Sequence, residues 1–200
     1  MCRYLDGFEQ MMVDTGDSLI KVARAGHGEP MLMLHGFPET HLMWHKIAPA
    51  LTEKYTVVLT DLRGYGESSH PQGLPDHSNY SKKTMSTDQA RVMEKLGYSS
   101  YYLVGHDRGA RVAYRMLLDY QENIKKCMLL DIIPGYDMYN RTDKDFAIAY
   151  YHWFFLAQQK GLPERILAVN REIFIRLFWV SIMTLRKVNK FFRKQSKPNL

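Results

Sequence analysis

Apolar runs of strand length alternate with helical patterns along residues 1–134 of the 200-residue chain. The runs at 30–36 and 55–62 are continuous, as expected for strands buried on both faces of a sheet. Two further strands are predicted at 101–106 and 124–132, and helices at 40–54, 81–97 and 108–119. Because parallel strands need a crossover between them, usually a helix, this alternation predicts an α/β fold with a mostly parallel sheet and helices on both faces.

The segments before and after this alternating region do not follow the strand–helix alternation. Residues 8–15 and 18–26 read as strands joined by Gly16-Asp17, which indicates an antiparallel hairpin. After Pro134 the segment 143–159 is aromatic-rich and helical, and no strand is predicted beyond it. We therefore expect a second, helical region after the sheet.

The positive charge of the chain is concentrated in its last thirty residues. The whole chain carries +6, but eight Lys/Arg and the single acid Glu172 give +7 within 171–200, which leaves −1 for 1–170. Nucleic acid is therefore not an expected partner of the main domain. The apolar stretch 173–185, followed by basic residues, suggests at most weak contact with an anionic membrane surface.

Cysteine usage and the N-terminus predict a cytoplasmic protein. Cys2 and Cys127 are the only cysteines, so a disulfide framework is not expected. No basic segment followed by an apolar stretch opens the chain, and no window of about 18 apolar residues predicts a spanning helix.

The stretch Gly105-His106-Asp107-Arg108-Gly109 falls between a predicted strand and a predicted helix. Gly-x-nucleophile-x-Gly in that context is the nucleophile-elbow pattern, here with aspartate as the nucleophile. A carboxylate can displace a leaving group from saturated carbon and form an ester, which water then hydrolyses with a histidine as general base. The alternative is a plain turn in which Asp107 caps the helix.

Two arginines follow Asp107 on one helical face, Arg108 and Arg111. Cations are unfavourable beside a helix N-terminus, and a pair of guanidinium groups suits a carboxylate ligand. A carboxylate held there would place its α-carbon beside Asp107, which describes a 2-haloacid. The alternative is that one arginine pairs with a surface acid, as we expect for Arg115 with Asp119.

Five segments together resemble one family, the fluoroacetate (haloacetate) dehalogenases of the α/β-hydrolase fold. They are HGFPET (35–40), DLRGYGESS (61–69), GHDRGARVAYRMLLD (105–119), LLDIIP (129–134) and YHWFFLAQ (151–158). The resemblance extends to about residue 165 and implies a small haloacid substrate and no cofactor. It also allows a homodimer.

The resemblance implies a role for each matching residue. Asp107 would be the nucleophile, Arg108 and Arg111 the carboxylate clamp, Asp131 the acid that orients the catalytic histidine, and His152 and Trp153 the halide-binding donors. Phe37 would line the pocket, and its backbone N–H would form an oxyanion-type hole with that of Arg108.

Several of these residues have simpler explanations. Asp131 could cap a strand end, and His152-Trp153 could be an ordinary aromatic patch. His35 is expected to hold loop geometry. His41 and His45 have metal-compatible spacing but no third ligand, so no metal is predicted.

The sequence departs from the family beyond residue 165. The family completes a helical cap, adds two strands and then supplies the catalytic histidine, whereas the last histidine here is His152. We therefore expect three segments: an α/β-hydrolase core (1–136), the start of a cap (137–170) and a divergent basic, apolar tail (171–200), with the C-terminal strands missing.

Two consequences are expected from this departure. The exposed sheet edge would favour aggregation. The expected activity is haloacetate dehalogenation impaired by the missing base; the alternatives are an epoxide hydrolase-like enzyme and a non-catalytic remnant.

Overall fold

The computed structural model describes residues 4–170, 172–174 and 176. The chain divides into two units, Met1–Gly135 and Tyr136–Leu200. Among the described residues, no helix is long and apolar enough to cross a membrane. The predicted tail 171–200 lies outside the described residues, except for 172–174 and 176, which are helical.

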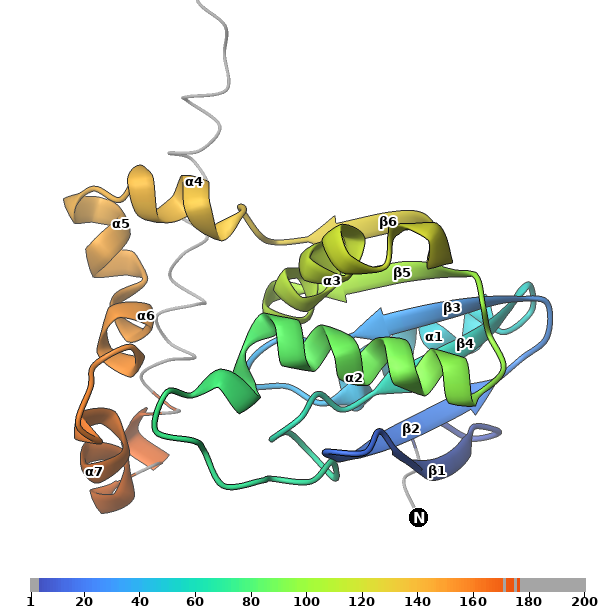
Figure 1. Cartoon of the computed structure of the whole chain (residues 1–200), viewed down its shortest axis with the longest axis horizontal. Helices are drawn as coiled ribbons and strands as arrows, with labels where there is room; N and C mark the ends of the chain where they lie inside the picture. The colour runs from blue at the N-terminus through green and yellow to red at the C-terminus, as the bar shows by residue number, and fades with distance from the viewer. Residues whose placement is uncertain (1–3, 171, 175, 177–200) are drawn as a thin grey trace, which may run out of the picture. The chain divides into compact units, whose positions relative to one another are not determined.

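The described part of the first unit contains a six-stranded sheet with the strand order β1-β2-β4-β3-β5-β6 (Figure 1). The strands are β1 (Glu9–Asp14), β2 (Leu19–Ala25), β3 (Glu29–Leu34), β4 (Tyr55–Thr60), β5 (Tyr101–His106) and β6 (Ile124–Leu130). Strands β4, β3, β5 and β6 run parallel, and β1 and β2 form the predicted antiparallel hairpin. The mostly parallel sheet predicted from the alternation is therefore present.

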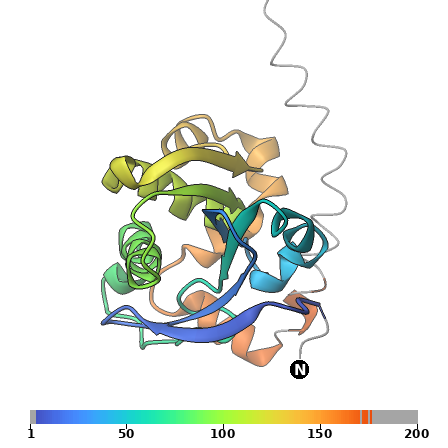
Figure 2. The same cartoon turned by 90° about the vertical axis from the view of Figure 1, so that its right-hand side faces the viewer.

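Helices cover both faces of this sheet, as the side view shows (Figure 2). On one face lie α2 (Lys82–Lys95) and α3 (Asp107–Asp119), and on the other lie a 3₁₀ helix η1 (His41–Lys46) and α1 (Ala48–Leu51). Short 3₁₀ turns η2 (Ser78–Tyr80) and η3 (Gln121–Asn123) precede α2 and β6.

The alternation of side chains along β3 divides the core into two apolar clusters. Leu32 and Leu34 pack in the cluster that includes Met93 and Val112 of the helices α2 and α3, whereas Met33 packs with Trp44 on the opposite face. All three β3 side chains are buried, as expected for a central strand covered on both sides.

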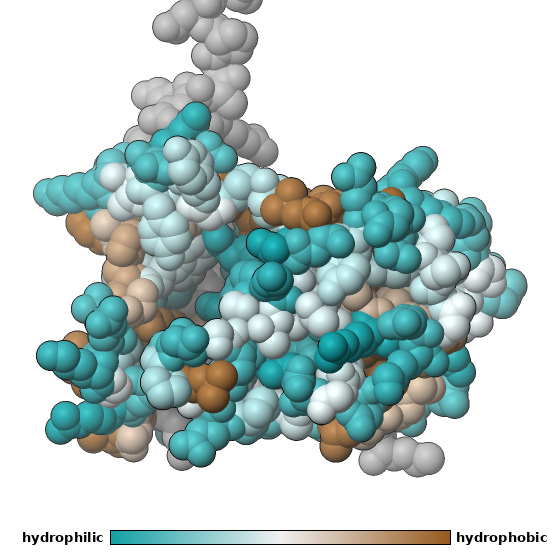
Figure 3. Space-filling view, viewed as in Figure 1, coloured by the Kyte–Doolittle hydropathy of each residue, from teal (hydrophilic) through white to brown (hydrophobic). Residues whose placement is uncertain are grey.

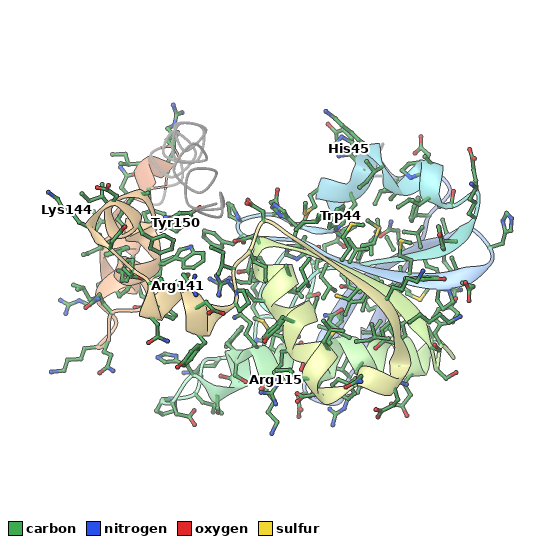
Figure 4. The ribbon with its side chains drawn as sticks, turned by 90° about the horizontal axis from the view of Figure 1, so that it is seen from above. Trp44, His45, Arg115, Arg141, Lys144 and Tyr150 are labelled. Atoms are coloured by element: carbon green, nitrogen blue, oxygen red, sulfur yellow. The ribbon has the colours of Figure 1, made fainter. Side chains whose placement is uncertain are left out.

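The single helix predicted at 40–54 is wrong, because the structure has η1 followed by the one-turn helix α1. Pro49 has no backbone N–H and its ring would clash with the carbonyl four residues earlier, so an unbroken α-helix cannot pass through it. Instead, Pro49 occupies the first turn of α1, where its missing N–H costs nothing. In Figure 4 Trp44 points toward the sheet and His45 away from it.

A buried polar network ties α2 to the sheet. Both side-chain oxygens of Asp88, on α2, accept from Arg63, at 2.8 Å from Nε and 2.7 Å from Nη2, and the Thr15 hydroxyl donates to Asp88 at 2.9 Å. Such bidentate, hydrogen-bonded pairs are costly to break when buried. The middle of α2 is therefore held in a defined position relative to Arg63 and Thr15.

The second unit is helical throughout its described residues. It comprises α4 (Gly135–Asn140, which begins at the unit boundary), α5 (Lys144–Ala149), α6 (Tyr151–Leu156) and α7 (Leu162–Val169). The segment predicted as helical at 143–159 is interrupted at Tyr150, whose φ of −110° and ψ of 31° leave the helical range. The ring of Tyr150 stacks on Phe146 at 4.6 Å and meets Trp153 edge-on at 5.3 Å, so aromatic contacts hold α5 against α6.

Candidate active site

A sharp turn joins β5 to α3 at Asp107. Its φ of 46° lies in the left-handed region, which non-glycine residues rarely occupy. The flanking glycines make room for the turn: a Cβ on Gly105 would lie 2.7 Å from the Cα of Ala110, and one on Gly109 would lie 2.4 Å from the carbonyl oxygen of His35. The geometry is that of a nucleophile elbow, which raises the Asp107 side chain above the sheet edge.

The carboxylate of Asp107 accepts a hydrogen bond from the backbone N–H of Phe37, 2.8 Å from Oδ1. The loop that carries Phe37 approaches the elbow closely, because a Cβ on Gly36 would lie 2.9 Å from the Cβ of Asp107. Only glycine at position 36 permits this contact. The Phe37 N–H, which the family resemblance implies for an oxyanion-type hole, is therefore directed at the candidate nucleophile.

His35 has the structural role that the sequence suggests. Its Nε2 accepts from the backbone N–H of Leu62 at 3.0 Å, so its Nδ1 carries the proton and donates to the carbonyl of Gly36 at 2.7 Å. Burial lowers the pKa of His35, which keeps the ring neutral. The ring thus fixes the loop on which Phe37 lies.

Two residues at this edge were not predicted from the sequence, Glu39 and His106. Glu39 Oε2 lies 3.2 Å from His106 Nδ1 and also accepts from the Gly36 N–H at 3.3 Å. The hydrogen bond that His106 donates to the Glu39 carboxylate raises the pKa of His106 above its ordinary value, although burial opposes the shift. Asp131 Oδ2 lies 4.0 Å from His106 Nε2, on the other side of the ring.

The predicted clamp residues lie on the first turns of α3. The guanidinium group of Arg108 lies 5.9 Å from the centre of the Phe37 ring, and Arg111 Nη1 lies 3.4 Å from where a Cβ on Gly135 would be. Both arginines are half-buried. A third cation, Lys82 at the start of α2, was not predicted. Burial first, and then Arg108 and Arg111, lower its pKa to about 8, with Asp107 acting in the opposite direction.

The remaining predicted residues lie in different settings. Asp131 follows β6 with a φ of 56° and a side chain that is 84% exposed. His152 and Trp153 lie on α6 in the second unit, with ring centres 6.2 Å apart and planes at 89°. Their position relative to Asp107 stays a prediction from the sequence.

Other polar residues have structural partners. His41 Nδ1 bonds Asp61 at 2.8 Å, and His45 Nδ1 donates to the carbonyl of Leu42 at 2.9 Å. Arg115 and Asp119 form the predicted surface pair, with both hydrogen bonds at 2.6 Å.

Comparison with known proteins identifies the class that this fold and elbow define. A family model for the alpha/beta hydrolase fold matches residues 29–159. The chain belongs to the α/β-hydrolase fold family.

The relatives include two kinds of hydrolase. A fluoroacetate dehalogenase from Burkholderia sp is 46% identical over 169 residues, which cover 84% of this chain and 56% of that protein. A soluble epoxide hydrolase from Corynebacterium sp. (strain C12) is 38% identical over 111 residues, covering 56% of this chain and 37% of that protein. These relatives support a hydrolase of the α/β family. The chain spans just over half the length of the dehalogenase.

Solved structures give the same fold. An alpha/beta hydrolase from Nostoc sp PCC 7120 superposes with a TM-score of 0.85 at 54% identity and covers 89% of this chain and 61% of that one. A Pseudomonas aeruginosa protein described as an epoxide hydrolase superposes with a TM-score of 0.84 at 42% identity, covering 90% and 60%.

Proposed function

We propose that this site displaces halide from a small 2-haloacid such as fluoroacetate or chloroacetate. The observation that supports this most is the setting of Asp107, a carboxylate on the elbow that accepts the Phe37 N–H and stands next to Arg108 and Arg111. The dehalogenase relative from Burkholderia sp supports the same substrate class.

In the first step, a carboxylate oxygen of Asp107 attacks the carbon that bears the halogen. The carbon–oxygen bond forms as the carbon–halogen bond breaks, and the halide leaves with the bonding electrons, so the product is an ester of Asp107 with glycolate. Arg108 and Arg111 hold the substrate carboxylate. The Asp107 oxygen and the halogen-bearing carbon are then already positioned, so the reaction loses little further translational and rotational entropy.

In the second step, water attacks the ester carbonyl, glycolate leaves and the Asp107 carboxylate is restored. The Phe37 N–H lies where it can stabilise negative charge that develops on the oxygen of that carbonyl. This step needs a base to accept the proton of water, and losing a positioned base costs about 10²–10⁴-fold.

We propose that residues 1–200, purified and tested alone, carry out this second step slowly. The last histidine in the sequence is His152. His106 is a poor substitute, because its raised pKa keeps it protonated over a wider pH range. The expected outcome is therefore one halide released per chain, followed by a long-lived ester.

Halide release tests this proposal directly. The purified chain is incubated with chloroacetate or fluoroacetate, and free halide is counted per protein molecule over time. We expect close to one equivalent, then a plateau or a much slower phase. Continuous release would show that another group acts as base, and no release from a folded sample would favour a non-catalytic remnant.

The second candidate is an epoxide hydrolase-like activity, which the Corynebacterium relative supports. An aspartate at the elbow can open an epoxide by the same attack on carbon. Arg108 and Arg111 favour an anionic substrate over a neutral epoxide. Mass spectrometry after incubation with styrene oxide distinguishes the two, because an adduct of styrene oxide on Asp107, with no halide released from chloroacetate in a parallel sample, would reverse the assignment.

A further inference from the structure

The first turn of α2 brings a lysine to the same edge of the sheet as the elbow. The helix α2 connects the parallel strands β4 and β5, and α3 connects β5 and β6. Each helix therefore begins on the side of the sheet where the preceding strand ends. Figure 1 shows the two helices side by side. Lys82 is the first residue of α2, which the Ser81 hydroxyl caps by accepting from the N–H of Thr84 at 3.1 Å. The electrostatic neighbours of Lys82 are Arg108, Arg111 and Asp107.

This placement is unfavourable for a lysine unless an anion is present. The first turn of α2 contains no acidic residue, and a cation there opposes the helix dipole. Lys82 is half-buried, and among the described residues no carboxylate forms an ion pair with its ammonium group. Burying a charge without a partner is costly. The next residue, Lys83, is exposed, so the burial is specific to Lys82.

We propose that Lys82 is a third member of the anion site, whose ammonium group positions the substrate carboxylate together with Arg108 and Arg111. The inference rests on the proposed function for the identity of the substrate, a small carboxylate. Three cations surround one resident acid, Asp107, so the cluster has a surplus of positive charge that a monovalent anion reduces.

The site should then respond to pH in the alkaline range. Arg108, Arg111 and Asp107 on α3 are the charged groups that act on Lys82. Tyr65, which faces Arg108 and Asp107, stays neutral because burial raises its pKa. Lys82, with a pKa of about 8, therefore loses its proton at a higher pH than an ordinary histidine and at a lower pH than an arginine. A bound carboxylate favours the ammonium form, so the affinity of the site should fall as the pH rises through about 8.

Acetate tests the proposal, because it has the carboxylate and no leaving group. Its dissociation constant is measured by calorimetry on the unchanged chain and on Lys82→Met, Lys82→Arg and Lys83→Met between pH 6.5 and 9.5. At pH 7 we expect about tenfold weaker binding in Lys82→Met, as for the loss of one charged hydrogen bond. Lys83→Met is the matched control, one residue along the same helix, and should bind like the unchanged chain.

The pH profile separates a role in binding from a structural role. The unchanged chain should lose affinity above pH 8, Lys82→Met should lack that decline, and Lys82→Arg should retain affinity at pH 9.5. Titration of His106 is common to all four proteins and cancels in the comparison. If Lys82→Met unfolds, as circular dichroism would show, the profiles of the unchanged chain and of Lys82→Arg decide the question.

The outcomes distinguish this inference from the proposed function. Equal acetate affinities in Lys82→Met and Lys83→Met, or no acetate binding by the unchanged chain, would overturn the role of Lys82 even if halide is released. Lysine-dependent acetate binding without halide release would support Lys82 and remove the dehalogenase assignment.

Discussion

Asp107 occupies a backbone conformation that glycine would adopt at lower cost. A non-glycine residue with a φ of 46° costs on the order of 1–3 kcal/mol, and surrounding structure must hold it there. The Phe37 N–H and the close approach of Gly36 supply that structure. We propose that an aspartate occupies this position because of the chemistry of its carboxylate.

Replacement of Asp107 by Asn should abolish halide release, because an amide oxygen is a far weaker nucleophile than a carboxylate. We expect a loss of at least about 10³-fold in the rate of the first step, measured with a halide electrode. The control is Asp119→Asn at the other end of α3, which removes only a surface pair with Arg115. Equal losses in the two variants would contradict the assignment of the nucleophile.

Glu39 and His106 should make stability depend on pH. The pKa of His106 is raised in the folded chain, so the pair stabilises fully below the unfolded value of about 6.5, and this contribution is lost as the pH rises through the folded pKa. The side chains are 27% and 24% exposed, so we expect about 1 kcal/mol.

The measurement is urea unfolding of the unchanged chain and of Glu39→Gln between pH 5 and 9. The difference in free energy of unfolding should shrink with rising pH. Glu67→Gln, which breaks the exposed pair with Lys21, is the control and should show no such trend near neutral pH. A difference that stays constant from pH 5 to 9 would exclude the proposed pairing.

At the scale of elements, α3 lies close to β3 because Gly109 has no side chain. A Cβ there would lie 2.4 Å from the carbonyl oxygen of His35 and 2.5 Å from that of Leu34, and both are backbone atoms that cannot rotate away. Gly109→Ala should therefore destabilise the chain by about 3 kcal/mol. Gly73→Ala, whose Cβ would meet only His77 at 3.9 Å, is the control. Urea unfolding of both variants measures the difference, and equal midpoints would contradict the packing described.

The elements that the sequence predicted well are those with strong periodicity. The strands β3, β4 and β5 and the helices α2 and α3 follow the predicted ranges, because continuous apolar runs and helical spacing need no distant partner to be recognised. The helix at 40–54 failed at Pro49, where local chemistry outweighs the pattern.

The site was predictable only in part, because a sequence pattern reveals local neighbours and not residues that the fold brings together from distant positions. The elbow and the arginines lie within one short motif of the chain, so their proximity could be inferred from sequence. Glu39 lies 67 residues from His106, and Lys82 comes from another helix, so their association requires the register of the sheet.

At the scale of the whole molecule, β6 is the last strand of the sheet in the described part of the chain. Figure 3 shows an apolar patch near the end of β6. Met128 within β6 and Ile133 after its end are exposed apolar residues. Within the described residues no strand pairs with the outer edge of β6, and an unpaired edge beside apolar side chains favours association between chains.

We therefore expect the purified chain to self-associate as its concentration rises, and Met128→Lys to reduce the association. Static light scattering measures the effect. Leu74→Lys changes an exposed apolar residue outside the sheet and serves as control. If Leu74→Lys reduced association as much as Met128→Lys, the edge would not be the contact surface.

Peptide mapping by mass spectrometry after exposure to chloroacetate tests the central claim, that Asp107 is alkylated by a small haloacid. The account predicts a single carboxymethyl group on the peptide that contains Asp107, absent in Asp107→Asn and formed in step with halide release. An adduct on Cys127 or on a histidine instead, with Asp107 unmodified while halide is released, would contradict it.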